Sequence, residues 1–178
     1  MSSPRVILLN GFAGSGKSTI ARMYVDNHPL AMVIEGDELI VNIGDWLDHE
    51  DEARDLVFAL TKEMLRASLS LGHDVIIPYL ATNAEEVAEL EQIATSSNSR
   101  FYEFYLATHK DHAVQRLLNR GAWGEAGLPP LTSDDTPRIT QLYEHMEAAL
   151  PKRPNQTHVQ IKEGSPVDTY QEVLKSIQ

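Results

Sequence analysis

The chain contains the stretch Asn10-Gly11-Phe12-Ala13-Gly14-Ser15-Gly16-Lys17-Ser18-Thr19, and this stretch decides its fold class. From Gly11 to Ser18 it fits the pattern Gly-x-x-x-x-Gly-Lys-[Ser/Thr] without a mismatch. Glycines let the backbone of such a loop direct its N–H groups at phosphate oxygens. A helix that begins near Gly16 would direct further N–H groups at the same anion. The stretch therefore predicts a site for a nucleoside triphosphate.

The residues on either side complete a strand, a loop and a helix. Arg5-Val6-Ile7-Leu8-Leu9 is apolar enough for a buried strand, and apolar residues recur at helical spacing from Ile20 to Val25. Lys17 can then reach the β- and γ-phosphates, and the Ser18 hydroxyl can ligate Mg²⁺. The residues expected to contact the nucleotide here are Gly11, Ala13, Gly14, Ser15, Gly16, Lys17, Ser18 and Thr19.

Strands and helices alternate along the rest of the chain. Further strands are expected at residues 30–34, 73–78, 100–107 and 158–162. Helices are expected at about 51–71, 84–95, 137–150 and 167–177, and another is expected to begin at 108 or 111 and to end at 119. The helix over 51–71 is expected to place Leu56, Leu60, Met64 and Leu71 on or near its apolar face, and Asn83 is expected to cap the next helix. This alternation predicts one α/β domain over residues 1–178, with a parallel sheet covered by helices on both faces.

Composition and charge restrict the kinds of ligand, chemistry and partner that the chain can have. The 178 residues carry a formal net charge of −11, which argues against DNA or RNA as the main partner but leaves room for a small phosphorylated molecule. The chain has no cysteine, so it has neither disulfides nor a thiol nucleophile. It shows no signal-peptide pattern and no apolar run long enough to cross a membrane. We therefore expect a cytoplasmic enzyme without a membrane partner.

Two carboxylates follow the second predicted strand. Glu35 and Asp37 lie at its carboxyl end, where open α/β sheets bind their ligands. Phosphoryl transfer to a hydroxyl needs a carboxylate that orients the acceptor and takes its proton, and Asp37 is the candidate for that role. Glu35 is the candidate that would assist Mg²⁺ or its water shell. The alternative is that both residues only cap the following turn.

Two arginines precede a long loop. Arg116 and Arg120 are four residues apart near the end of a predicted helix, so they share one face. The loop that follows, about residues 120–133, is rich in glycine and proline and contains Trp123. Such a loop is typical of a lid whose arginines neutralise charge during phosphoryl transfer, with Arg138 as a weaker third candidate. The alternative is that the two cations only stabilise the end of the helix.

These features occur in an order that resembles the small P-loop kinases. The matching segments are Gly11 to Ser18, Glu35-Gly36-Asp37, Arg116-x-x-x-Arg120 and Gly164-Ser165-Pro166. The family includes shikimate kinase, gluconate kinase, chloramphenicol phosphotransferase and the adenylate-kinase-like group. The resemblance implies a single three-layer P-loop NTPase domain with a five-stranded parallel sheet in the order 2-3-1-4-5, a short lid, and ATP with Mg²⁺ as cofactors.

The resemblance also implies roles for individual residues. Asp37 would bind the acceptor or act as the base, Arg116 would lie against adenine, and Arg120 would face the phosphates. Ser165 and Pro166, in the loop after the fifth strand, would border the base. The third strand ends without a carboxylate, so Ser18 and Glu35 are the predicted metal ligands, with water as the alternative to Glu35. Side chains that could line an acceptor pocket, but could equally serve in packing or capping, are Asn42, Trp46, Tyr79, Thr82 and Asn83.

Together these observations predict an ATP-dependent phosphotransferase that moves the γ-phosphoryl group to a hydroxyl or a phosphate of a small molecule. Catalysis would depend on Lys17, Asp37 and Arg120. Two alternatives remain open: a nucleotide-dependent switch that signals through a partner, and a toxin-like or antibiotic-modifying kinase of a larger acceptor. The sequence leaves the acceptor and the choice between monomer and dimer open.

Overall fold

The structure is a computed structural model that describes residues 3–124, 126–149, 153 and 155–177. Glu125 of the predicted lid and Leu150, the predicted end of a helix, lie outside the described residues, as do the first two residues and the last of the predicted domain.

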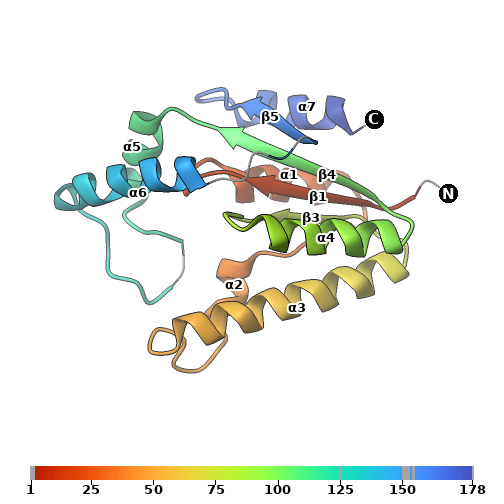
Figure 1. The fold of residues 1–178 in the computed structure, drawn as a ribbon. Helices are drawn as coiled ribbons and strands as arrows, with labels where there is room; N and C mark the ends of the chain where they lie inside the picture. Colours follow the sequence, from red (N-terminus) through yellow and green to blue (C-terminus); the bar gives the residue numbers. More distant parts are fainter. Residues whose placement is uncertain (1–2, 125, 150–152, 154, 178) are drawn as a thin grey trace.

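Five parallel strands form one sheet in the order β2-β3-β1-β4-β5, and this confirms the predicted α/β fold and strand order (Figure 1). Strand β1 lies at the centre and pairs with β3 from Val6–Val75 to Leu9–Pro78, and with β4 on its other side. The strands are β1 (Arg5–Asn10), β2 (Met32–Val33), β3 (Val75–Pro78), β4 (Arg100–Ala107) and β5 (Gln156–Gln160).

Helices lie on both faces of the sheet (Figure 1). Within the described residues, none of them combines the length and the apolar composition needed to cross a lipid bilayer. The helices are α1 (Lys17–Asn27), α2 (Gly36–Ile40), α3 (Glu50–Ser70), α4 (Ala84–Ser96), α5 (Lys110–Arg120), the 3₁₀ helix η1 (Ser133–Asp135), α6 (Thr136–Ala149) and α7 (Pro166–Ser176).

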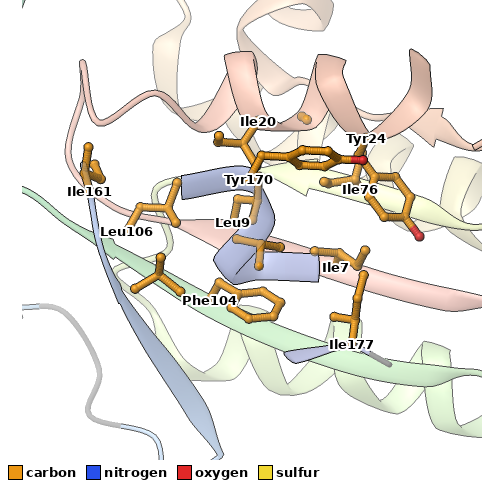
Figure 2. Packing of buried hydrophobic residues seen from close by; sticks show 13 residues of the cluster. Ile7, Leu9, Ile20, Tyr24, Ile76, Phe104, Leu106, Ile161, Tyr170 and Ile177 are labelled. Carbon is orange, nitrogen blue, oxygen red and sulfur yellow. The ribbon is translucent and has the colours of Figure 1, made fainter. Parts of the chain in front are cut away.

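Alternating side chains of β1 belong to two separate hydrophobic cores, one on each face of the sheet. Ile7 and Leu9 pack with residues of α1 and α7, including Tyr24 and Tyr170 (Figure 2). Val6 and Leu8 point to the opposite face, where they pack with residues of α3 and α4. Because successive residues of a strand alternate between faces, a strand with helices on both sides must be apolar throughout.

The predicted apolar face of the long helix is wrong at its leucines, whereas the predicted Met64 is partly buried and packs against the core. Leu56, Leu60 and Leu71 are 47%, 42% and 72% exposed. The residues of α3 that the protein buries are Ala53, Val57, Thr61, Leu65, Ser68 and Leu69. The exposed leucines are not part of this buried stripe.

Two strands differ from their predicted limits. Only Met32 and Val33 of the predicted strand 30–34 belong to β2, because Leu30 has a φ of +66° and lies in the turn after α1. Strand β5 covers residues 156–160 rather than 158–162. The backbone N–H of Ile161 still donates to the Ala107 carbonyl at 2.9 Å, so the chain continues beside β4 past the end of β5.

A polar network joins the first strand to the first helix. Asp74 accepts hydrogen bonds from the Arg5 backbone N–H at 2.8 Å, from the Arg5 guanidinium at 2.7 and 3.0 Å, and from the Tyr24 hydroxyl at 2.7 Å. Burial alone would raise the pKa of Asp74, but these hydrogen bonds outweigh it and hold the pKa below its usual value. The network therefore stabilises the fold most when Asp74 is ionised.

Replacing this carboxylate should destabilise the protein. We expect Asp74→Ala to lower the free energy of unfolding by about 3 kcal/mol, because it leaves the Arg5 guanidinium and the Tyr24 hydroxyl without their shared acceptor. Denaturant unfolding at pH 7 measures the loss. Since the pKa is lowered on folding, the difference from wild type should shrink as the pH falls below about 4.

The matched control is Glu63→Ala, which removes an ion pair with Arg66 on the exposed side of α3. It should change stability by less than about 1 kcal/mol. Equal losses in the two variants, or a loss for Asp74→Ala that persists at pH 2, would contradict the assignment.

Candidate active site

The loop between β1 and α1 has the conformation that its glycines allow. Gly11, Gly14 and Gly16 have φ values of +147°, +78° and +89°, a region that other residues adopt with strain. At Gly11 space is also limiting, because an added Cβ would lie 2.8 Å from the Leu106 carbonyl oxygen. Helix α1 begins at Lys17, directly after the loop, so its N-terminus faces the phosphate position.

Lys17 is folded back onto this loop. Its Nζ donates to the carbonyl oxygens of Gly11 at 2.7 Å and Phe12 at 3.0 Å. Burial lowers the pKa of Lys17 to about 8, and the nearby carboxylates of Asp37 and Glu35 oppose this shift only in part. An anion that enters the loop would favour the protonated ammonium, so binding and protonation of Lys17 are linked.

Ser18 and Glu35 meet at the mouth of the loop, where the Ser18 hydroxyl donates to Glu35 Oε1. A hydroxyl and a carboxylate are the oxygen ligands that Mg²⁺ prefers, so the two residues fit the predicted metal site. Among the described residues, no group of three or more His, Cys, Asp or Glu side chains could hold a metal ion. Phosphate oxygens and water would therefore complete the coordination, as Mg²⁺ sites commonly require.

Asp37 lies in the first turn of α2 and lines the same cleft as Lys17, a cleft with a volume of about 930 Å³. The loop between α5 and α6 approaches it from the other side: a Cβ added to Gly124 would lie 2.9 Å from Asp37 Oδ2 and 3.7 Å from Arg120 Nη2. Gly124 has a φ of +151°. A side chain at this position would therefore be strained in its backbone and would displace the Asp37 carboxylate.

The predicted lid is closed at its base and packs against the cleft. The Leu131 N–H donates to the Gly121 carbonyl at 2.9 Å, and Arg120 Nε donates to the Ala122 carbonyl at 2.8 Å. The Arg138 guanidinium lies 5.8 Å from the centre of the Trp123 ring, and both side chains line the cleft. In Figure 1 this segment extends from α5 and α6 towards α2 and the start of α3.

A second cavity, of about 380 Å³, also borders the phosphate loop and shares Gly14, Gly16 and Thr19 with the first. Arg116 and Pro166 line it, and Arg116 is held by its hydrogen bond to the Gly14 carbonyl at 3.2 Å and by an ion pair with Glu163. Arg116 and Pro166 therefore lie together, and their contact with the base stays a prediction. Ser165 is not among the residues that line the cavity; it precedes α7 as its N-cap.

The remaining predicted nucleotide contacts divide between the two cavities. Ala13, Lys17 and Ser18 line the first, Ser15 lines the second, and the residues that line both are Gly14, Gly16 and Thr19.

Some of the residues predicted to line an acceptor pocket do line the first cavity, and others have different contacts. Tyr79 and Thr82 line the first cavity. Trp46 is buried in a cluster with Ile40, and Asn83 caps α4 by accepting from the Glu85 N–H at 2.9 Å. Asn42 donates to the Glu38 carbonyl at 2.7 Å. The last three residues therefore serve packing and capping in this structure.

Asn10 is a site residue that the sequence analysis did not single out. It is fully buried, and its Oδ1 accepts from the N–H groups of Gly11 at 2.8 Å and Ala81 at 3.1 Å. Its Nδ2 donates to the Ala81 carbonyl at 3.1 Å. One side chain thus fixes the first residue of the phosphate loop relative to the loop after β3. A buried polar residue at the end of an apolar strand was the available signal.

Comparisons with known proteins agree with this geometry. A family model described as "AAA domain" matches residues 6–130. The structure is similar to a sugar kinase from Janibacter sp. HTCC2649, with 18% identity, a TM-score of 0.68, and coverage of 99% of this chain and 95% of that one. A comparison with curated proteins found no match to the chain.

Two further structures show the same fold. A gluconokinase from Sinorhizobium meliloti 1021 has 16% identity and a TM-score of 0.63, with 99% of this chain and 97% of that chain covered. The Mycobacterium tuberculosis APS kinase CysC, in complex with AMPPNP and APS, has 17% identity and a TM-score of 0.61, with 99% of each chain covered.

The lowered pKa of Lys17 should make triphosphate binding depend on pH. Because the free protein loses the ammonium charge near pH 8 and the phosphates favour it, ATP affinity should fall about tenfold between pH 7 and pH 9. Isothermal calorimetry at both pH values measures this fall. In Lys17→Arg, whose guanidinium does not titrate in this range, ATP affinity should change much less with pH. An equal fall in ATP affinity for wild type and Lys17→Arg would contradict the prediction.

Removing the Asn10 side chain should affect both stability and nucleotide binding. Asn10→Ala leaves buried backbone groups of Gly11 and Ala81 without partners, so we expect a loss of about 2–4 kcal/mol in the free energy of unfolding and weaker ATP binding. Asn83→Ala removes an exposed helix cap in the same connection and should cost only about 1 kcal/mol, with ATP affinity unchanged. Denaturant unfolding and calorimetry measure both effects; similar behaviour of the two variants would refute the role of Asn10.

Proposed function

The chain belongs to the AAA domain family, and from this membership and the geometry of its cleft we propose that it is an ATP-dependent phosphotransferase that acts on a hydroxyl of a small molecule. The phosphate loop is the evidence for nucleotide binding. The side chains of Asp37 and Arg120, which line the same cleft, are the reason for choosing a transferase over a switch.

One observation carries the proposal. Asp37, Lys17 and Arg120 line the same cleft, and the lid backbone at Gly124 closes against both Asp37 and Arg120. A carboxylate that faces the phosphate position across a cleft can orient a hydroxyl for attack. A switch would not need a cavity of about 930 Å³ beside its phosphate loop.

The proposed reaction is a single displacement at phosphorus. The acceptor hydroxyl oxygen forms a bond to the γ-phosphorus, and the bond from that phosphorus to the β–γ bridging oxygen breaks. The bond's electron pair stays on ADP, and the hydroxyl proton passes to the Asp37 carboxylate. Lys17 and Arg120 neutralise the charge that develops on the transferred group, and backbone N–H groups of the phosphate loop hold the β-phosphate.

Ser18 and Glu35 would hold Mg²⁺, which supplies charge neutralisation at the β- and γ-phosphates when it is bound. The protein's own contribution is mainly positioning. Arg116 and the backbone at Gly164–Pro166 would border the base, and the lid would exclude water, so that the acceptor competes successfully with hydrolysis.

Asp37→Asn separates the chemical step from nucleotide binding. The amide keeps the size of the side chain but cannot accept the hydroxyl proton, so we expect kcat for acceptor-stimulated ADP release to fall by about 10²–10⁴-fold. The dissociation constant for ATP should stay within about threefold of wild type, because the carboxylate does not hold the nucleotide in this proposal. A coupled assay over a panel of alcohols measures turnover, and calorimetry measures binding.

The matched control is Asp111→Asn, on the exposed first turn of α5, which should leave both quantities unchanged. Unchanged turnover in Asp37→Asn would remove that residue from the mechanism. ADP release that no alcohol stimulates, but a protein partner does, would favour the regulatory alternative.

A further inference from the structure

The first cavity extends beyond Asp37, away from the phosphate loop. Its lining there comes from α3, from the connection between β3 and α4, and from α4 itself. We call this part the acceptor end, and the part around Lys17 the phosphate end. The two ends differ in charge, and this difference restricts what the acceptor can be.

Cations gather at the phosphate end. Among the described lining residues, four cationic side chains lie there with three carboxylates, those of Glu35, Asp37 and Asp135. The cationic residues are Lys17, Arg116, Arg120 and Arg138. This excess of positive charge suits a triphosphate.

The acceptor end has the opposite balance. Beyond Asp37, its described lining contains the carboxylates of Glu50, Asp55 and Glu86 but one guanidinium, that of Arg54. Arg54 itself pairs with Glu50, at 2.7 Å from its Nη2 to Glu50 Oε1. An anionic group in this end would face like charges, whereas an ammonium group would face opposite ones.

Apolar surface and one fixed carboxylate complete the acceptor end. The rings of Phe58 and Tyr79 lie nearly parallel, with centroids 6.4 Å apart and an angle of 16° between their planes. The Tyr79 hydroxyl donates to Glu86 Oε2 at 2.7 Å, so Glu86 is held beside this aromatic wall. The end can therefore accept a molecule with an apolar face and a basic group.

We propose that the acceptor is a hydroxyl-bearing organic cation: a molecule whose hydroxyl reaches Asp37, whose apolar face contacts Phe58 and Tyr79, and whose protonated amine lies near Glu86 and Asp55. This inference rests on the proposed function, because it names the class of molecule that receives the phosphoryl group. It excludes sugar acids and phosphorylated acceptors. The hydroxyl oxygen replaces the bridging oxygen at the γ-phosphorus, ADP keeps the electron pair of the broken bond, and Asp37 takes the proton.

Fragment binding tests the charge preference without any need for turnover. The probes are benzylamine, benzyl alcohol and benzoate, which share one ring and differ in charge. Titrations followed by amide chemical shifts of Tyr79, Leu80 and Thr82 should show benzylamine binding about tenfold more tightly than benzoate at these positions. Benzyl alcohol should be intermediate. Benzoate binding as tightly as benzylamine, or no saturable benzylamine shift, would overturn the proposal.

Two substitutions on different helices test whether the carboxylates of the acceptor end cause the preference for a cation. Glu86→Gln and Asp55→Asn should each weaken benzylamine binding by about three- to tenfold and leave benzyl alcohol within twofold. Glu89→Gln is the matched control, since Glu89 lies one turn along α4, pairs with Lys62 and does not line the cavity. The proposal would be overturned if Glu89→Gln lost the preference for benzylamine over benzyl alcohol. It would also be overturned if Glu86→Gln and Asp55→Asn both kept that preference. Thermal unfolding of each variant identifies any that fails to fold.

A matched series of alcohols extends the test to turnover with ATP. It consists of 2-amino-1-phenylethanol, 1-phenyl-1,2-ethanediol and mandelate, which carry an ammonium group, a neutral group and a carboxylate beside the same hydroxyl. The order of kcat/KM should be cation, neutral, anion, and a preference for mandelate would overturn the proposal. If none of the three stimulates ADP release while the fragment preference holds, the proposed transfer fails for these alcohols and the charge selection stands. The two failures are therefore distinguishable.

Discussion

Pairing between the parallel strands β1 and β3 is the constraint on which the site depends. The ladder runs from Val6–Val75 to Leu9–Pro78 and is continued by the Tyr79 N–H, which donates to the Leu9 carbonyl at 2.9 Å. The Asn10 side chain then joins the phosphate loop to Ala81. Because parallel strands end at the same edge, this pairing brings a phosphate-binding loop and the wall of the acceptor end to one cleft.

The fold could be predicted because two of its signals are local. The glycine pattern from Gly11 to Ser18 specifies a strand, a loop and a helix, and apolar strands alternate with helices after it. The buried face of α3 could not be read in the same way. Large leucines such as Leu56 and Leu60 suggest a core face, yet the structure buries Ala53 and Val57 instead. The neighbours that α3 meets in the tertiary structure decide which of its faces is buried.

The site was predictable where chemistry fixes both residue type and place in the chain. Lys17 and Asp37 meet these conditions, and the structure places them on one cleft. Asn10 was missed because its partners at Ala81 lie 71 residues away. In the sequence, the carboxylates of Asp55 and Glu86 cannot be told apart from ordinary charges on solvated helix faces. Their contribution emerges only when α3 and α4 enclose the same cavity, which gives the cleft opposite charge at its two ends.

The most direct test of this account follows the terminal phosphate of ATP. The protein is incubated with Mg²⁺ and γ-³²P-labelled ATP in the presence of a mixture of amino alcohols, and the label is separated into phosphate esters and inorganic phosphate. The account predicts that most of the label appears in an ester of one alcohol and that none does so with Lys17→Ala. Label that appears only as inorganic phosphate, whatever alcohol is added, would contradict a transfer site between the phosphate loop and Asp37.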